Sequence, residues 1–581
     1  MNTKIGKLLG IMLAVLVLAA GTAHGDNQKK VALVMKALTN PFFNKMQIGA
    51  KEYATAAGVP LEVFGVDRET DVERQISIMD NLISRGYAAI VLAPADSKKL
   101  VPVCKKAVER GIVVINIDNP LDKETLRQAG VRIPFVGSDN SRGAGMVGQY
   151  VRRRLGGKGR VLVIEGIRGA ENADLRKSGF IKAVTTDSEI QIVASESANW
   201  HTDEAFALVS RLLREKGPVD AIFCANDSMA LGALRALDLS EPGRKVTVGS
   251  YDNIEAVRNE MRNGRIHATI EQHPELMGAY GVELAAHALS GGKAPETTPT
   301  PLDLITYESF GKKISLCISR TDTPFFDSLA KGAKKAADLF GAELDISDSG
   351  NDDAKQLTCL KNHIDAKVDA VIVNPTNSER VVPGIELANT AGIPIFTVDR
   401  AATGGKVLAH ITSDNLEGGR LAAECLAKLL GDKGRVLELE GTPGTTSAHD
   451  RGLGFEKALV AHPGIKIVAR RMGDFDRARA RKAVAQVLAE GIAFDAVFAH
   501  NDEMILGALQ AFEDAKAPRP ILVGFDAIPE AVKQVQSGKL NATIAQQPET
   551  LGWLAVDAVV KHLRGEEFPP SIHVALKLIS R

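Results

Sequence analysis

Short apolar runs alternate with longer segments of helical pattern along both halves of the chain. In the second half, the apolar run 370–373 precedes a helical pattern over residues 379–391. Gly392 and Pro394 then interrupt the chain before a second apolar run at 395–398. Continuous apolar strands separated by helices of roughly 10–15 residues are typical of a parallel sheet buried on both faces. The pattern therefore predicts an α/β fold of doubly wound parallel sheets.

The chain also repeats itself once. Three stretches of the first half return in the same order in the second half: 31–43 as 314–326, 226–234 as 501–509, and 268–274 as 542–548. The offsets are 283, 275 and 274 residues. A period of this length indicates duplicated whole modules rather than a solenoid of short repeats.

The N-terminus has a composition of its own. Lys4 and Lys7 precede the apolar run 8–20, and the small residues around Ala23 and Gly25 follow it. This order predicts a cleavable secretory signal peptide over residues 1–25, with an uncleaved anchor as the alternative. We therefore expect a periplasmic protein with one module at residues 26–310 and a second at 311–581.

Charge and cysteine content narrow the function further. The chain holds 71 basic and 71 acidic residues and has a formal net charge of zero, which favours no nucleic-acid partner. Its five cysteines lie far apart and in no metal-ligand spacing: Cys104, Cys224, Cys317, Cys359 and Cys425. We interpret them as small buried hydrophobes rather than a disulfide framework, and expect neither a metal site nor a cofactor.

Aromatic and polar residues follow the strand-like runs of the second half. In parallel sheets, ligands bind beyond the carboxyl ends of the strands, where the loops gather. The residues there are Phe325, Phe326, Phe475, Phe525, Asp399, Arg400, Arg451, Asn501, Asp526 and Gln546. Aromatic rings suit the weakly apolar faces of a sugar, and fixed polar groups suit its hydroxyls.

Each of these residues also has an ordinary structural explanation. Phe325 and Phe326 open a helix after Pro324, where they can pack into a core. Asn501 can cap the helix that follows it. The pair Asp399 and Arg400 can form a surface turn, and Gln546 can be a loop residue. Their shared place at the strand ends of one sheet favours a binding site.

The second half resembles the ribose-binding members of the periplasmic binding protein family, which capture sugars for ABC importers. The resemblance covers residues 312–581 and rests on an ordered set of landmarks: Ser319, 324–326, 398–400, 413–415, 451–452, 474–476, 501–504, 524–526 and 545–546. It implies that Phe326 and Phe475 stack on the sugar ring. It also implies that the polar set Asp399, Arg400, Arg451, Asn501, Asp526 and Gln546 bonds to the sugar hydroxyls. Thr323 stands where the ribose binders carry Asn, which alters one hydroxyl contact. We expect ribose or a related pentose or hexose.

The first half, residues 29–308, resembles the same family with a different site. Its candidate residues are Lys36, Asn40, Phe42, Phe43, Asp118, Asn119, Arg176, Trp200, Asn226, Asp252 and Gln272. Asn119 stands in the place of Arg400, and Lys36 is expected to supply a positive donor from the opposite wall. Lys36 and Trp200 resemble the allose-binding branch. The two sites are therefore expected to differ in specificity.

The resemblance implies two lobes per module, with the sugar between them. Three chain crossings are expected to join the lobes, near 138–139, 272 and 302–305 in the first module and near 413–414, 546 and 573–575 in the second. Lobe closure would present the loaded module to an inner-membrane permease.

Three other functions compete with sugar import. One is a sensor that presents its ligand to a chemoreceptor or a sensor kinase. A sugar-responsive repressor shares the fold but requires a helix-turn-helix where this chain has an export signal. A glycosidase is also disfavoured, because Arg400 and Arg451 are expected to hold Asp399 and Asp526 ionised, so we expect a binder without catalysis.

Overall fold

The computed structural model describes residues 29–581, and the expected signal peptide lies outside the described residues. The chain divides into two compact units between Tyr307 and Glu308. We call these units the first and the second module. Each is described by itself below.

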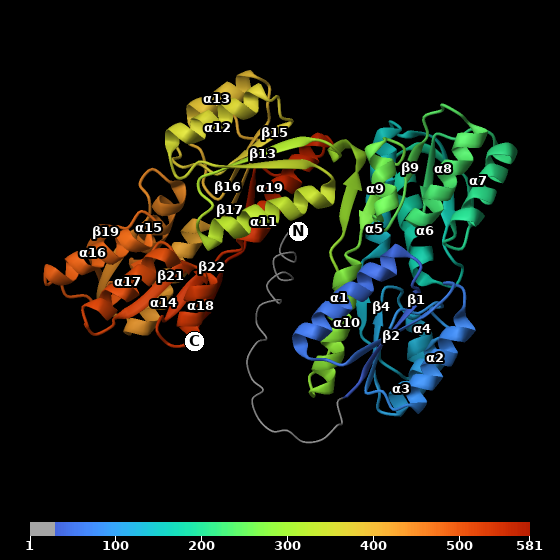
Figure 1. Cartoon of the computed structure of the whole chain (residues 1–581), viewed down its shortest axis with the longest axis horizontal. Coiled ribbons are helices and arrows are strands. Elements are labelled where there is room, and N and C mark those ends of the chain that lie inside the picture. Colours follow the sequence, from blue (N-terminus) through green and yellow to red (C-terminus); the bar gives the residue numbers. More distant parts are fainter. Residues whose placement is uncertain (1–28) are drawn as a thin grey trace. The chain divides into compact units, whose positions relative to one another are not determined.

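Each module contains two α/β lobes, which we name 1A and 1B in the first module and 2A and 2B in the second (Figure 1). Lobe 1A contains β1 (Val31–Ala37), β2 (Leu61–Val66), β3 (Ala89–Leu92), β4 (Val113–Ile117), β5 (Phe135–Gly137), β11 (Thr297–Pro299), α1 (Pro41–Ala57), α2 (Val72–Ser84), α3 (Val101–Glu109), α4 (Lys123–Ala129) and α10 (Pro274–Leu289). Lobe 1B contains β6 (Lys158–Glu165), β7 (Glu189–Ser197), β8 (Ala221–Cys224), β9 (Thr247–Gly249), β10 (Ala268–Glu271), β12 (Asp303–Thr306), α5 (Asn140–Arg154), α6 (Glu171–Thr185), α7 (Thr202–Lys216), α8 (Asp227–Ser240) and α9 (Glu255–Arg262).

The second module repeats this plan. Lobe 2A contains β13 (Lys313–Ile318), β14 (Glu343–Asp348), β15 (Ala370–Val373), β16 (Ile395–Val398), β17 (Ala409–Ser413), β23 (Ser571–Val574), α11 (Pro324–Phe340), α12 (Asp353–Asp365), α13 (Val382–Thr390) and α19 (Pro548–Leu563). Lobe 2B contains β18 (Gly434–Glu440), β19 (Ile465–Met472), β20 (Ala496–Ala499), β21 (Ile521–Asp526), β22 (Ala542–Ala545), β24 (Lys577–Ser580), α14 (Asn415–Leu430), α15 (Thr446–Leu459), α16 (Arg477–Ala489), α17 (Asp502–Asp514) and α18 (Pro529–Gln536).

The sheets confirm the predicted fold class. Every lobe has a six-stranded sheet, ordered β11-β5-β4-β3-β1-β2, β12-β10-β9-β8-β6-β7, β14-β13-β15-β16-β17-β23 and β19-β18-β20-β21-β22-β24. Pairing is parallel except where β12 joins β10 and β24 joins β22. The strands at 370–373 and 395–398 lie as predicted, but α13 begins three residues later than expected. Asn377 accepts bonds from two backbone N–H groups there and holds a turn instead.

Three crossings join the lobes of each module. In the first module the chain changes lobe between β5 and α5, between β10 and α10, and between β11 and β12. In the second module it does so between β17 and α14, between β22 and α19, and between β23 and β24. The third crossing of the first module lies at residues 300–302, and most of the expected stretch 302–305 belongs to β12 instead.

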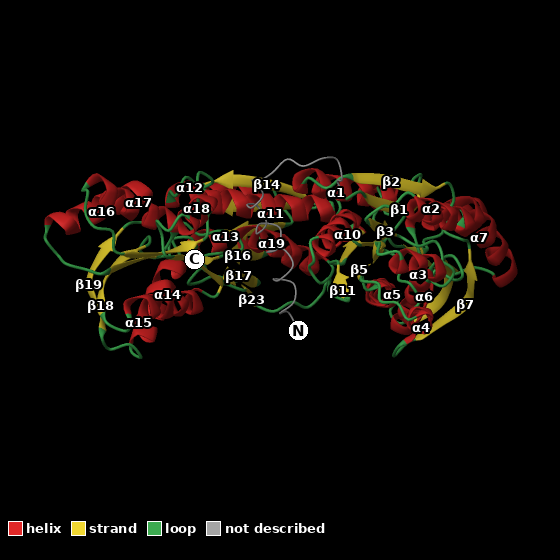
Figure 2. Ribbon diagram, turned by 90° about the horizontal axis from the view of Figure 1, so that it is seen from below, coloured by secondary structure: helices red, strands yellow, loops and turns green. Residues whose placement is uncertain are grey.

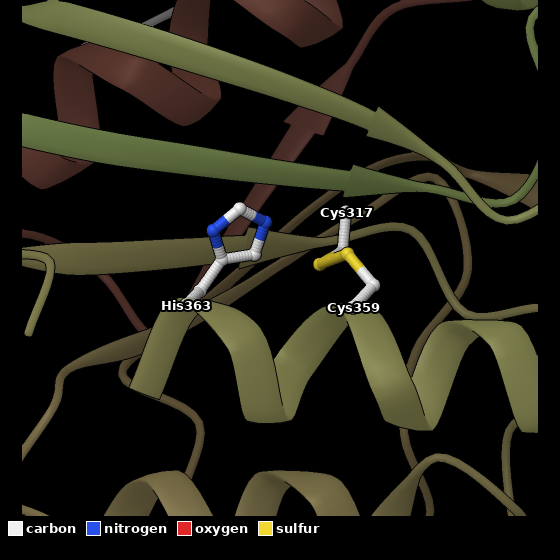
Figure 3. Close-up of side chains that lie close together, drawn as sticks. All are labelled: Cys317, Cys359 and His363. Atoms are coloured by element: carbon white, nitrogen blue, oxygen red, sulfur yellow. A yellow bond between two sulfur atoms is a disulfide. The ribbon is translucent and has the colours of Figure 1, made fainter. Parts of the chain in front are cut away.

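A disulfide in lobe 2A corrects the interpretation of the cysteines. Cys317 on β13 and Cys359 on α12 form a disulfide and are 42 positions apart in sequence (Figure 3). Sequence spacing gives no sign of this pair, because only the packing of α12 on the sheet brings the two sulfurs together. Cys104, Cys224 and Cys425 are free and buried, as predicted.

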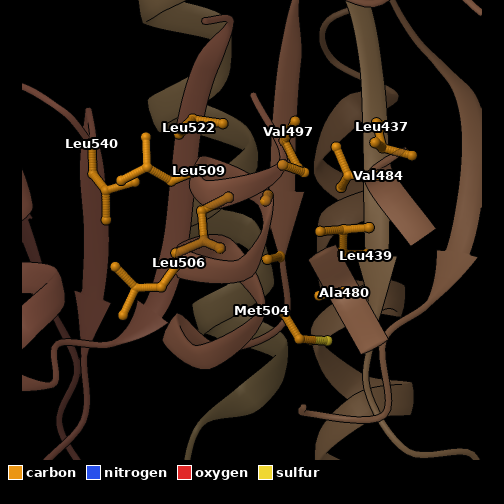
Figure 4. Close-up of a cluster of buried hydrophobic side chains, with 14 of the residues drawn as sticks. Leu437, Leu439, Ala480, Val484, Val497, Met504, Leu506, Leu509, Leu522 and Leu540 are labelled. Atoms are coloured by element: carbon orange, nitrogen blue, oxygen red, sulfur yellow. The ribbon is translucent and has the colours of Figure 1, made fainter. Parts of the chain in front are cut away.

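Helices cover both faces of the sheets (Figure 2). Along β1, alternate residues enter two separate cores: Leu33 packs with residues of α1 and α10, and Val34 with residues of α2 and α3. Lobe 2B has the same arrangement, and Figure 4 shows the core between its sheet and helices α16 and α17, with Leu437, Val497 and Leu522 from the strands. Burial on both faces explains why the strands read as continuous apolar runs. In residues 29–581, no helix is long and apolar enough to span a membrane.

Candidate functional site

The two lobes of each module touch across a cleft. In the second module, Ser378 of lobe 2A donates its backbone N–H to the Gly444 carbonyl of lobe 2B at 2.8 Å, and the N–H of Thr446 in lobe 2B donates to the Ser378 hydroxyl at 3.2 Å. In the first module, Ser97 of lobe 1A and Gly169 of lobe 1B make the equivalent backbone bond at 3.1 Å. Both modules are therefore in a closed state.

A pocket lies between lobes 2A and 2B. It encloses about 530 Å³, part of it open to solvent. The predicted residues that line it are Thr323, Phe325, Phe326, Asp399, Arg400, Arg451, Phe475, Asn501, Asp526 and Gln546. The fold thus brings together residues from both lobes and from the second hinge crossing.

Arg451 is the fixed cation of lobe 2B. Its Nε donates to the Asn415 side chain at 2.9 Å, its Nη1 lies 3.7 Å from Asp526 Oδ1, and its guanidinium carbon is 3.9 Å from the centre of the Phe525 ring. Asp526 also accepts from Gln546 Nε2 at 2.7 Å. These contacts hold the arginine and the carboxylate in one orientation.

Asp399 and Arg400 form the opposite charged wall. Both are buried at the end of β16, with Arg400 Nε 3.7 Å from Asp399 Oδ2. Asp399 accepts from the Asn374 amide at 3.1 Å. Arg400 Nε is buried without a hydrogen-bond partner among the described residues, so it can serve a ligand.

The pKa values correct one expectation. Burial raises the pKa of Asp399, and it raises the pKa of Asp526 to about 7, although Arg400 and Arg451 act in the opposite direction. The arginines were expected to outweigh burial. Desolvation has the larger effect on both pKa values because the closed lobes enclose both carboxylates.

Strained backbone occurs at the same positions of both modules. Asp399 has a φ of 64°, Phe475 of 56° and Asp526 of 117°, and the equivalent Asp118 and Trp200 have 65° and 66°. Such conformations cost on the order of 1–3 kcal/mol for residues other than glycine and persist only where the surroundings impose them. Their repetition singles out these residues as the functional part of each pocket.

A second pocket, of about 250 Å³, lies between lobes 1A and 1B. It is lined by Lys36, Asn40, Phe42, Phe43, Glu69, Asp118, Asn172, Arg176, Trp200, Asn226 and Asp252. Arg176 repeats the setting of Arg451, with Nε 2.7 Å from the Asn140 side chain, Nη1 3.3 Å from Asp252 Oδ1, and the guanidinium over Tyr251. Burial raises the pKa of Asp252 well above its ordinary value.

The wall of lobe 1A differs most from its counterpart. Lys36 Nζ lies 3.1 Å from Asp118 and 3.9 Å from Glu69, and Glu69 accepts from the Asn40 amide at 3.1 Å. Lys36 lies one residue before the end of β1, and Asp118 follows β4 of the same sheet. Lys36 therefore does not act from an opposite wall as expected. Glu69 and Lys36 thus form a buried ion pair. The second module has the uncharged residues Asn351 and Ser319 at the corresponding positions.

Unpartnered polar atoms converge on the pocket of the first module. Trp200 Nε1 and Asn172 Oδ1 are buried without a hydrogen bond among the described residues. Buried polar groups are normally hydrogen-bonded, so a donor and an acceptor left open around one pocket point to a polar ligand that can both accept and donate hydrogen bonds.

Comparison with known proteins agrees with this geometry. The family described as periplasmic binding protein domain matches residues 31–293 and 314–567. This chain belongs to the periplasmic binding protein family. It is 43% identical over 267 residues to the ribose import binding protein of Haemophilus influenzae, a match that covers 46% of this chain and 91% of that protein. It is 39% identical over 296 residues to the D-ribose/D-allose-binding protein of Pseudomonas aeruginosa, covering 50% and 92%. It is 32% identical over 290 residues to the D-allose-binding periplasmic protein of Escherichia coli, covering 50% and 91%.

Four predicted residues do not line the pockets of this periplasmic binding protein. Ser319 is buried within lobe 2A, where its N–H donates to the Asn374 side chain, and Phe525 is fully buried against Arg451. Asn119 joins the lobes instead, accepting from the Asn172 N–H at 3.1 Å. Gln272 accepts from the Ser138 hydroxyl and donates to Asp252, both at 2.7 Å, so it braces the hinge behind the pocket.

The alternative role of Asn501 is also realised. Its side chain accepts from the Met504 N–H at 2.9 Å as the N-cap of α17, and Asn226 caps α8 in the same way. Both still line their pockets, so capping and site placement coincide. Asn40 likewise caps α1, whereas Thr323 makes no side-chain capping bond.

The sequence alone missed several lining residues. In the second module these are Arg320, Pro324, Asn351, Thr442, Ser447, Asp474, Glu503 and Ile528, and in the first they are Glu69 and Asn172. Glu69 and Asn351 precede α2 and α12, after edge strands β2 and β14. A systematic alignment of the two halves would have placed both at strand ends.

In lobes 1B and 2B, a glycine packs directly against the aromatic ring that lines the pocket. A Cβ on Gly441 would lie 2.1 Å from Cζ of Phe475, and one on Gly166 would lie 2.0 Å from the Trp200 ring. Gly441→Ala is therefore expected to displace Phe475 and weaken ligand binding at the second module at least tenfold, while the first module is unaffected. Equilibrium binding to each module measures this, with Gly166→Ala as the mirror variant. An unchanged affinity would remove Phe475 from the ligand contacts.

Proposed function

We propose that this chain is the solute-binding component of an ABC-type sugar importer and encloses one monosaccharide in each module. The observation that carries the proposal is the pair of closed pockets. Each combines aromatic rings from both lobes with buried, pre-oriented arginine and carboxylate groups, an arrangement suited to a neutral polyhydroxylated ring. The names of the relatives support the same class of ligand.

The two pockets favour different sugars. The pocket of the second module has an arginine from each lobe, Arg400 and Arg451, and the ring of Phe475. Ribose or a related pentose is its proposed ligand. The first has the Lys36–Glu69 pair and the broader Trp200 ring, for which allose or another hexose is proposed. One protein would then deliver two sugars, or one sugar from two sites, to a permease in the inner membrane.

The proposed role is binding without catalysis. Asp526 and Asp399 each already accept an amide donor, from Gln546 and Asn374, which orients them as acceptors for hydroxyl groups. The names of the relatives support import from the periplasm and offer no support for the chemoreceptor alternative. The periplasm is accordingly the proposed location.

Intrinsic fluorescence tests the first pocket. The chain has two tryptophans: Trp200 lines that pocket, while Trp553 packs near Phe340 in lobe 2A. In a Trp553→Phe variant the tryptophan emission therefore comes from Trp200 alone. We expect saturable changes in this emission on addition of D-allose or D-ribose, because a ring stacked on the indole alters its surroundings.

A matched variant makes the result specific. Adding Arg176→Ala to Trp553→Phe should abolish the fluorescence response while the circular dichroism spectrum stays that of the parent. If no aldose changes the emission of the folded parent, the sugar-binding role of the first module is wrong.

A further inference from the structure

Cys317, Cys359 and His363 form a cluster away from the sugar pockets. Cys317 lies on β13, and Cys359 and His363 lie one turn apart on the facing side of α12 (Figure 3). The two sulfurs and a ring nitrogen all lie within 4.8 Å of one another. The sequence predicts no metal site here, because the spacing between Cys317 and Cys359 resembles no ligand motif.

The first module shows that the fold does not require these residues. Val31 on β1 pairs with β2, and Ile314 on β13 pairs in the same way with β14, so Val31 and Ile314 are equivalent. Gln75 of α2 and Gln356 of α12 each donate to the backbone carbonyl that follows the neighbouring strand, so they are equivalent as well. By this alignment the first module has Val34, Ile78 and Leu82 where the second has Cys317, Cys359 and His363. Two neighbours change as well, from Ala32 and Phe64 to Ser315 and Ser347. Where the first module has an apolar cluster, the second therefore has two sulfurs, an imidazole and two hydroxyls.

Two serine hydroxyls hold the imidazole in place beside the sulfurs. His363 is buried, with Nδ1 2.8 Å from the Ser315 hydroxyl and Nε2 3.2 Å from the Ser347 hydroxyl. A ligating histidine uses one nitrogen for the metal and is commonly held through the other by a hydrogen bond.

The dimensions also fit. Zinc binds sulfur at about 2.3 Å and imidazole nitrogen at about 2.0–2.1 Å, so a tetrahedral site separates its ligand atoms by roughly 3.5–3.8 Å. The three ligand atoms already lie within 4.8 Å of one another, and opening the disulfide lets the sulfurs separate toward this spacing. Three protein ligands leave the fourth position to water.

We propose that Cys317, Cys359 and His363 form a redox-gated site for a thiophilic divalent cation such as Zn²⁺. A dithiol reduces the disulfide: the pair gains two electrons and two protons, and the dithiol becomes a cyclic disulfide. Each thiol then releases its proton as its sulfur binds the cation. Reoxidation by a disulfide oxidant re-forms the S–S bond, returns two electrons to the oxidant and expels the cation.

Zinc titration of the full chain tests this. The protein is reduced anaerobically with a phosphine, freed of reductant, and titrated with Zn²⁺ in competition with a chromophoric chelator. We expect one more zinc per reduced chain than per oxidised chain. With Co²⁺, thiolate-to-cobalt charge-transfer absorption should appear only in the reduced protein.

The first module supplies the control substitutions. Cys359→Ile and His363→Leu introduce the residues of the first module. The first should remove the additional zinc, and the second should weaken its binding at least tenfold while leaving the disulfide able to form. If Cys359→Ile keeps the additional zinc, that zinc binds elsewhere, for example at the cluster of Glu271, His273 and Glu275, and the proposal is wrong. Equal zinc binding by the oxidised and reduced wild-type chains would overturn the proposal, and this comparison requires no variant to fold.

Discussion

Arg451→Ala is expected to weaken sugar binding at the second module by about 2–5 kcal/mol, roughly 30- to 5,000-fold in Kd. The guanidinium is held by Asn415, lies 3.7 Å from Asp526 and stacks over Phe525. Its removal leaves the buried Asp526 without its cation and removes a charged donor to the ligand. Calorimetric titration measures the loss.

The matched variant is Arg176→Ala, which should have the same effect on the first module alone. Each variant is expected to keep the full affinity of the other module, because the two arginines serve separate pockets. An Arg451→Ala chain that binds sugar at both sites as tightly as the wild type would remove Arg451 from the binding machinery.

Loss of the Cys317–Cys359 disulfide is expected to lower the stability of the second module by about 4 kcal/mol. The bond closes 42 residues of chain, and a loop of this length restricts the unfolded state by about that amount. For a module of this size, the melting temperature should fall by roughly 10 °C. Differential scanning calorimetry of Cys317→Val/Cys359→Ile measures the change with residues that the first module already tolerates.

The first module is the internal reference for this measurement. Cys104 and Cys224, its two cysteines, are free, so its unfolding transition should not move. If both transitions keep their temperatures, the disulfide contributes nothing to the folded chain. Movement of both would indicate that the modules unfold as one unit.

The sequence predicted the fold and most of each pocket for a clear physical reason. Parallel strands buried on both faces read as apolar runs, and their carboxyl ends mark where side chains such as Asp399, Arg451 and Asp526 can converge. The repeat then provides each position twice. Phe475 was predicted from its place after a strand-like run of the second half, and Trp200 from the resemblance of the first half to the same family.

The remaining features depend on tertiary packing. Asn119 and Gln272 stand at strand ends but serve lobe contact and hinge bracing, which only the closed structure reveals. The pairing of Cys317 with Cys359 depends on how α12 packs against β13. The pKa of Asp526 depends on the balance between burial and Arg451, and neighbouring charge in the sequence gives no measure of burial.

The central claim is that each module encloses its own sugar. Isothermal titration calorimetry of the purified chain with D-ribose and with D-allose tests it most directly. We predict two sites per chain, with the two sugars favouring different modules and each site removed by its own arginine variant. Absence of binding for both sugars, in protein shown to be folded, would contradict the account.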